Sequence, residues 1–125
     1  MKIETSDGDI LDKISILELK KELIEDKAKL VNINKELNIL YESCTELINN
    51  PKIKHLYINL KETNRKLWMI ENSIRVKESK KEFDYEFTNL ARSVYFTNDR
   101  RAEIKKEINT QLESKITEEK SYQKY

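Results

Sequence analysis

The scarcity of turn-forming residues is the feature that most restricts how this chain of 125 residues can fold, because it contains one glycine and one proline. A sheet of several strands needs a tight turn at each reversal, and such turns are usually built on these two residues. Charged residues make up 38% of the sequence, which is typical of long helices with wide solvent-exposed faces. The sequence therefore predicts one all-α domain, either an antiparallel four-helix bundle or a pair of long helical hairpins.

Hydrophobic periodicity and capping residues predict four helices, roughly over residues 9–25, 27–49, 51–79 and 84–118. Ser6 and Asp7 carry side-chain oxygens that can accept hydrogen bonds from the first turn of the first helix. Pro51 suits the first turn of the third helix, and Asp84 suits the N-cap of the fourth. The fourth helix is longer than the others, so its end is expected to pack on another subunit, bend back or fray.

The first predicted helix is apolar on two opposite sides. One side carries Ile10, Ile14, Leu17 and Ile24, and the other carries Ile16, Leu19 and Leu23. A helix of this kind has to be covered twice, either in the middle of a bundle or at a subunit interface. Together with the length of the fourth helix, this pattern predicts a homo-oligomer, with a dimer as the expected form.

The second predicted helix has apolar residues alternately three and four positions apart, which is the pattern of a coiled-coil seam. The seam consists of Leu30, Ile33, Leu37, Leu40, Cys44 and Leu47. Cys44 is the one cysteine of the chain, and its place in the seam favours a small buried hydrophobic residue over a nucleophile.

Polar residues lie along one edge of the apolar stripe in the third predicted helix. In the stretch NRKLWMIENSIR, helical spacing places Asn64, Glu71 and Arg75 on the same side, beside Trp68. Trp68 is interpreted as a residue at the boundary of the core. The three polar residues, by contrast, form a continuous polar edge next to a core, and this predicts a partner for them on a neighbouring helix.

The fourth predicted helix has polar residues in the middle of its apolar face, at Asn98, Arg101 and Lys105. A charge on such a face needs a partner, because burying it alone is costly. Antiparallel packing of the third and fourth helices would bring Asn64 near Arg101. We expect Arg101 to pair with a carboxylate of the first or third helix, Glu18 or Glu71, since a guanidinium can bind a carboxylate through two hydrogen bonds.

Three interpretations of this polar cluster are open from the sequence. It can fix helix register and oligomeric state, as single polar residues do in coiled coils. It can instead bind a small anionic ligand between helices, with Asn64, Glu71, Arg75, Asn98 and Arg101 as the candidate ligand-binding residues. The side chains can also simply reach solvent. A ligand site would leave a cavity of a few hundred Å³, whereas a register device would leave these groups directly paired.

Charge and composition exclude several classes of partner. Lysine and arginine number 24 and aspartate and glutamate 23, so we expect no nucleic acid partner. His55 is the one histidine, and it has no second histidine or cysteine nearby, so neither a metal nor another cofactor is expected. No apolar run approaches the roughly 20 residues that cross a bilayer. The start of the sequence lacks a secretory apolar segment, and the expected location is cytoplasmic.

No set of residues specifies a reaction, so the sequence favours a non-enzymatic role. A helical nucleotide pyrophosphohydrolase needs several inward carboxylates to hold Mg²⁺. Glu22 and Glu25 have suitable spacing, but no second acidic pair follows on an inner face. Catalytic residues are therefore not assigned.

Four stretches of the chain resemble a family of small bacterial and phage helical proteins designated only as a domain of unknown function, the DUF6165 type. These stretches are GDILDKISILELKKELIEDKAKL at 8–30, NRKLWMIENSIR at 64–75, FDYEFTNLARSVYFTNDRRAEIKKEIN at 83–109 and EEKSY at 118–122. The resemblance covers nearly the whole chain and implies a loose link to surface-polysaccharide synthesis, without any specific chemistry.

The sequence thus favours a homo-oligomeric helical interaction or accessory module. The alternative is an enzyme or binding protein for a small phosphorylated or carboxylated metabolite, such as a sugar nucleotide, that uses the polar cluster.

Overall fold

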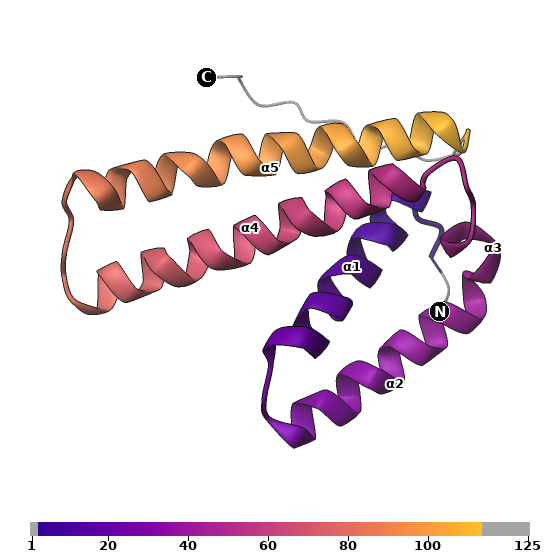
Figure 1. The fold of residues 1–125 in the computed structure, drawn as a ribbon, viewed down its shortest axis with the longest axis horizontal. Coiled ribbons are helices and arrows are strands. Elements are labelled where there is room, and N and C mark those ends of the chain that lie inside the picture. The colour runs from indigo at the N-terminus through magenta and orange to yellow at the C-terminus, as the bar shows by residue number, and fades with distance from the viewer. Residues whose placement is uncertain (1–2, 114–125) are drawn as a thin grey trace.

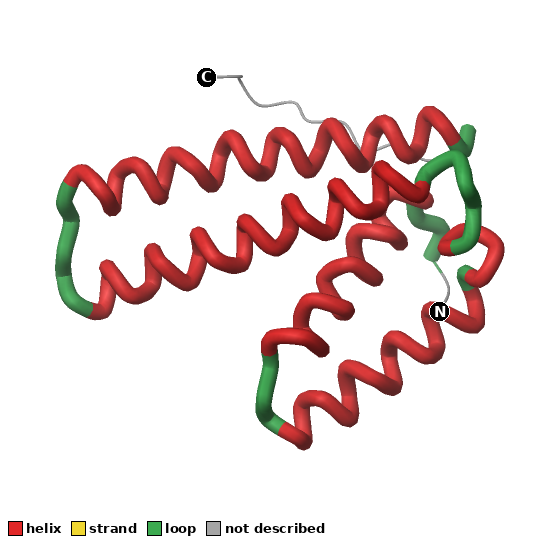
Figure 2. Tube along the Cα trace, in the orientation of Figure 1, coloured by secondary structure: helices red, strands yellow, loops and turns green. Residues whose placement is uncertain are grey.

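The computed structural model describes residues 3–113, which form five α-helices and no β-strand. The helices are α1 (Asp7–Leu23), α2 (Lys27–Ser43), α3 (Thr45–Ile48), α4 (Lys54–Ser79) and α5 (Tyr85–Gln111). The predicted all-α class is confirmed. A four-helix antiparallel bundle is not, because α4 and α5 form one long hairpin and the shorter pair of α1 and α2 is inclined to it (Figure 1). Short loops join the helices of each pair (Figure 2).

Helix α1 lies between α2 and the α4–α5 pair and packs against all three of these helices. On one side, Leu11 joins a buried cluster with Ile53, Leu56, Leu60, Ile104 and Ile108. On the other side, Ile14 and Leu17 join a second cluster with Ile33 and Leu37 of α2. The prediction that this helix is covered on two sides by other helices is confirmed, and both coverings come from the same chain. The predicted second side is covered only in part, because Leu19 is buried but Leu23 is 42% exposed.

Side-chain caps set the starts of three helices. Ser6 Oγ accepts a hydrogen bond from the Asp9 amide at 3.1 Å, and α1 begins at Asp7, two residues earlier than predicted. Asp26, which was not predicted as a cap, accepts from the amides of the first turn of α2. Asp84 accepts from the Phe87 amide at 2.9 Å, as its predicted role requires. Each cap satisfies an amide that the helix itself leaves without a partner.

The predicted helix over 27–49 is interrupted near its end, because the helix breaks at Cys44 between α2 and α3. The hydroxyl groups of Ser43 and Thr45 donate hydrogen bonds to carbonyls one turn earlier, a contact that bends helices. The break turns Leu47 and Ile48 toward the cluster around Leu11. Cys44 itself packs against the α2 cluster as a partly buried residue, and burial raises the pKa of its thiol.

The third predicted helix begins at Lys54 rather than at residue 51. Residues 51–53 form a turn in which Asn50 Oδ1 accepts from the Lys52 amide at 2.9 Å. This turn buries the side chain of Ile53, which is 1% exposed, at the entrance of α4. Pro51 therefore belongs to the turn and not to the helix.

The fourth predicted helix ends at Gln111 rather than at residue 118, and Leu112 is its C-cap. Glu113 has a φ of 52°, a left-handed conformation that cannot continue an α-helix. Residues 114–125, which include the rest of the predicted end, lie outside the described part of the chain. At this end, the last turn of α5 reaches past the first turn of α4 (Figure 1).

The outer part of the α4–α5 pair, residues 65–103, is a two-helix projection that we name the distal hairpin (Figure 1). Its base contacts α1 through Arg65 and Arg101, and the rest extends past α1. Its seam is made of half-buried residues, namely Leu67, Ile70, Ile74, Phe87, Leu90 and Val94, and no residue of 65–103 is fully buried. Two helices alone cannot enclose their shared apolar stripe. The distal hairpin is therefore the least supported part of the described fold.

Ionic contacts stabilise the turn at the tip of the distal hairpin. Lys77 Nζ lies 2.9 Å from an Asp84 carboxylate oxygen, and it also contacts Glu82 and Glu86 at 3.1 Å each. Hydrogen bonds to Asp84 and then to Glu86 raise the pKa of Lys77, and the contact with Lys77 lowers the pKa of Asp84. Lys81 has a φ of 57°, so the turn takes a left-handed residue without using glycine.

Candidate functional site

A buried carboxylate on α1 organises the polar residues where α1 meets the α4–α5 pair. Asp12 Oδ1 accepts hydrogen bonds from Arg101 Nε at 3.0 Å and from Asn64 Nδ2 at 2.8 Å. Asp12 Oδ2 is paired with Arg101 Nη2, so the guanidinium binds the carboxylate through two nitrogens. We name Asp12, Ser15, Asn64 and Arg101 the polar junction. The Asp12 side chain is 7% exposed and that of Arg101 is 30% exposed.

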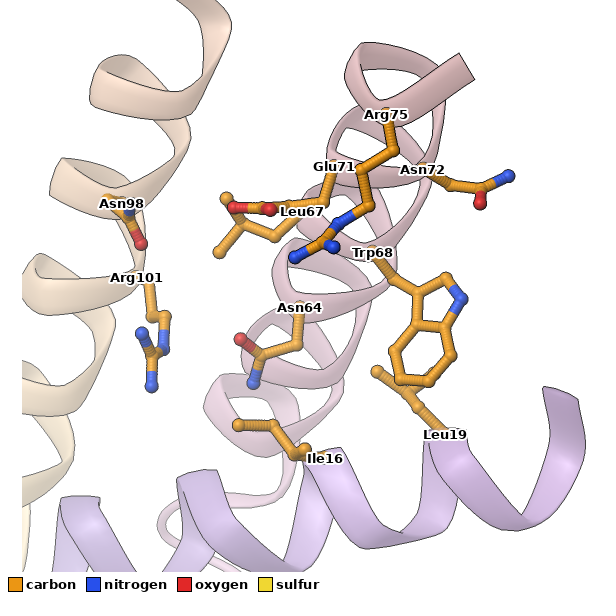
Figure 3. A pocket seen from close by; sticks show the side chains of 10 residues that line it. All are labelled: Ile16, Leu19, Asn64, Leu67, Trp68, Glu71, Asn72, Arg75, Asn98 and Arg101. Carbon is orange, nitrogen blue, oxygen red and sulfur yellow. The ribbon is translucent and has the colours of Figure 1, made fainter. Parts of the chain in front are cut away.

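Ser15 completes the polar junction and fixes the orientation of Asn64. Asn64 Nδ2 donates to Ser15 Oγ at 2.8 Å as well as to Asp12, and Ser15 Oγ donates to the Asp12 carbonyl at 2.7 Å. A carboxamide nitrogen has two hydrogens, and both are used here. Asn64 therefore turns its amide nitrogen toward α1 and its carbonyl oxygen away from α1 (Figure 3).

The same face of α5 makes further polar contacts with the start of α1. Lys105 Nζ lies 2.7 Å from Asp9 Oδ1, and Asn109 Oδ1 accepts from the Gly8 amide at 2.8 Å. Burial alone would raise the pKa of Asp9, but the hydrogen bond from Lys105 and smaller contacts hold it below its usual value. Gly8 allows the close approach, since a Cβ there would lie 2.7 Å from the Lys105 carbonyl oxygen.

The predicted partner of Arg101, Glu18 or Glu71, is wrong. The observed partner is Asp12, which lies on one of the two predicted helices. Glu18 points to α2, where it accepts from the Tyr41 hydroxyl at 2.8 Å. Burial and this contact raise the pKa of Tyr41 to about 12. Glu71 is exposed on α4. Asp12 could have been found from the sequence, because it precedes Ile16 by four residues and so extends the second apolar face of that helix.

A cavity of about 450 Å³ lies directly beside the polar junction, between α1, α4 and α5. Its polar lining residues are Asn64, Glu71, Asn72, Arg75, Asn98 and Arg101, and its apolar lining residues are Ile16, Leu19, Leu67 and Trp68 (Figure 3). Pockets for small molecules typically measure about 300 to 1,000 Å³ and combine apolar walls with a few polar groups. This cavity has both properties.

Two charged residues at the rim of the cavity, Glu71 and Arg75, make no polar contact with the rest of residues 3–113. Glu71 extends from α4 toward α5, and the guanidinium of Arg75 turns back along α4 toward Asn64 (Figure 3). Their i, i+4 spacing would allow an ion pair, which usually stabilises a helix. Within residues 3–113, however, neither side chain takes part in an ion pair or hydrogen bond. Both are exposed and available to a bound molecule.

Comparison with known proteins assigns the chain to a family. The profile of a family of unknown function, DUF6165, matches residues 1–125. The chain belongs to this family. The predicted resemblance is thereby confirmed. No curated protein and no solved structure shows significant similarity to this DUF6165 chain.

Two further properties of the described part of this DUF6165 member concern membrane spans and metal ions. No helix within residues 3–113 combines the length and apolar character of a membrane span. The same residues contain no group of three or more histidine, cysteine, aspartate or glutamate side chains placed to hold a metal ion.

In this DUF6165 member, all five residues selected from the sequence line this cavity, but they divide into two groups. Asn64 and Arg101 each donate a hydrogen bond to Asp12 within the polar junction, as expected of a structural device. Glu71, Arg75 and Asn98 surround the open space beside it, as expected of a ligand site. The apolar wall formed by Ile16 and Leu19 was not predicted from the sequence, because the inclination of α1 against α4 brings these residues to the cavity.

Proposed function

We propose that the protein binds a small carboxylated or phosphorylated metabolite in the cavity between α1, α4 and α5. The observation that carries this proposal is the cavity of about 450 Å³, with Glu71 and Arg75 at its rim and no ion pair to either side chain within residues 3–113. The sequence favoured an interaction module, but a register device alone would have left no such space. The link to surface-polysaccharide synthesis stays a prediction.

The polar junction supports ligand binding by holding the cavity wall in place. Arg101 is held by two hydrogen bonds to Asp12, and Asn64 by hydrogen bonds to Asp12 and Ser15. A wall that is already ordered loses little conformational entropy when a ligand binds. Arg75, by contrast, is exposed and free to close on an anionic group through a bidentate contact.

Replacement of Arg75 by methionine is expected to abolish ligand binding without unfolding the protein. In a thermal-shift screen of phosphorylated sugars, sugar nucleotides, carboxylates and amino acids, a ligand at about one hundred times its dissociation constant stabilises the wild type by about 2.7 kcal/mol. The variant should lose most of that shift, because the methionine side chain keeps the alkyl bulk but removes the charge.

The matched control for that measurement is Arg92→Met, which removes an exposed arginine of α5 that does not line the cavity. It should keep the full ligand shift. Equal shifts in Arg75→Met and the wild type would contradict binding at this site, and so would the absence of any shift across the whole screen.

Self-association through the distal hairpin is a second proposed function, supported by a separate observation. No residue of 65–103 is fully buried, and Met69, Val76, Phe83, Tyr85 and Tyr95 are large exposed apolar residues of this segment. The two apolar sides of α1 do not call for a partner, because α2 and the α4–α5 pair cover them. A second distal hairpin, packed in an antiparallel manner, would complete a four-helix core.

Light scattering is expected to give twice the chain mass of 15.0 kDa at micromolar concentration. Substitution of Met69 by glutamate, with Tyr95 replaced by serine, should return the mass to that of one chain, because both side chains are more than half exposed on the distal hairpin. Ile58→Glu is the control on the near half of α4, where Ile58 is also more than half exposed, and it should leave the mass unchanged. A single-chain mass for the wild type would contradict self-association.

A further inference from the structure

We infer that the ligand of the cavity is a zwitterion that carries an ammonium group and a carboxylate, as an α-amino acid does. This inference rests on the proposed function and narrows its ligand class. The signs of the charges around the cavity, and the direction in which the polar junction turns Asn64, are the observations that carry it.

The charges that line the cavity sum to zero once the polar junction is taken into account. Arg101 lines the cavity, but its charge is matched by Asp12 through two hydrogen-bonded nitrogens. What is left is one carboxylate, on Glu71, and one guanidinium, on Arg75, with no ion pair to either within residues 3–113. A ligand with one charge of each sign would satisfy both side chains at once.

A hydrogen-bond acceptor is fixed next to these charges. Both hydrogens of the Asn64 amide are directed to Asp12 and Ser15, so the group that Asn64 offers to the cavity is its carbonyl oxygen. An ammonium group has three donors and no acceptor. The Glu71 carboxylate and the Asn64 carbonyl oxygen suit such a group, and neither suits an anion.

Arg75 is suited to bind the carboxylate end of the ligand. Its planar guanidinium matches the two oxygens of a carboxylate through parallel hydrogen bonds. Ile16, Leu19, Leu67 and Trp68 provide an apolar wall on which an uncharged side chain can pack. A phosphate or sugar nucleotide fits less well, since its two or more negative charges would meet one available guanidinium and be repelled by Glu71.

The inference can be tested by isothermal titration calorimetry of the full chain. The ligands are the twenty standard L-amino acids, glucose 6-phosphate and a uridine diphosphate sugar. The best-binding amino acid is then compared with its N-acetyl derivative, which lacks the ammonium, and with its amide, which lacks the carboxylate. We expect an amino acid to bind tightest, and each derivative to bind about tenfold more weakly or worse.

Glu71→Gln provides the decisive variant, because it keeps the shape of the side chain and removes its charge. The site then has one unmatched positive charge, so the amino acid should lose affinity while the N-acetyl derivative gains, and the tenfold preference should disappear. Glu78→Gln, an exposed residue of α4 outside the cavity lining, is the control and should keep the wild-type preference. Equal thermal unfolding midpoints of the two variants would show that both are folded.

The outcomes separate this inference from the proposed function. Tighter binding of glucose 6-phosphate or the nucleotide sugar than of any amino acid, lost in Arg75→Met, would overturn the zwitterion and leave the binding site standing. A preference for the amino acid that persists unchanged in Glu71→Gln would also overturn the inference. If no compound of the panel binds the wild type, both proposals fail.

Discussion

Replacement of Asp12 by alanine is expected to destabilise the protein by about 3 kcal/mol, the lower end of the range for breaking a buried ion pair. The variant leaves the Arg101 guanidinium without its carboxylate and removes one of the two acceptors of Asn64. The lower end applies because the Arg101 side chain is 30% exposed and can recover some hydration. Urea denaturation of wild type and variant measures the difference.

A double-mutant cycle separates the pair from its surroundings. Arg101→Met alone should also destabilise the protein, since it leaves the Asp12 carboxylate, which is 7% exposed, without its cation. The double variant should cost clearly less than the sum of the two single variants, because neither charge is then left alone. Glu71→Gln is the control on the exposed rim and should change stability by no more than about 0.5 kcal/mol. Simple additivity of the two effects would contradict the pairing.

Gly8→Ala is expected to destabilise the protein by about 2 to 4 kcal/mol, through overpacking and the loss of a buried hydrogen bond. The added Cβ would lie 2.7 Å from the Lys105 carbonyl oxygen and 3.0 Å from Asn109 Oδ1. The first of these atoms belongs to the backbone of α5, so the two helices would have to move apart. Gly8 lies within α1 and its φ is not positive, so close approach is the property that requires glycine here.

The direction of the stability change in Gly8→Ala tests this prediction. Helix propensity alone predicts that alanine stabilises a helix by about 1 kcal/mol relative to glycine, so a stabilised Gly8→Ala variant would contradict the close packing of α1 on α5. Asn109→Ala serves as the control, because it removes the hydrogen bond to the Gly8 amide without adding an atom. It should cost less than Gly8→Ala in the same denaturation experiment.

Features that depend only on residues close together in the sequence could be predicted from the sequence. Helical spacing placed Asn64, Glu71 and Arg75 on one edge of α4, and it identified Asn98 and Arg101 as polar interruptions of α5. The caps at Ser6 and Asp84 followed from the same local chemistry. These predictions succeeded because the spacing of a helix is independent of what packs against it.

Features that depend on tertiary packing were missed. Asp12 and Arg101 are 89 positions apart, and their pairing follows from the inclination of α1 against the hairpin, which no local pattern encodes. The break at Cys44 and the left-handed Lys81 use neither glycine nor proline, so both lacked the usual sequence signal. The size of the cavity likewise depends on how α1 crosses α4.

The position of the cavity couples the two proposed functions. Its lining begins where full burial ends on α4, at Asn64, and continues into the distal hairpin as far as Arg75. A ligand in the cavity would therefore contact both the part of the α4–α5 pair that packs against α1 and the part that projects from it. If dimerisation through the distal hairpin changes the affinity of the cavity for its ligand by some factor, thermodynamic reciprocity requires the ligand to change the affinity between the chains by the same factor. Self-association would then serve as a readout of metabolite concentration.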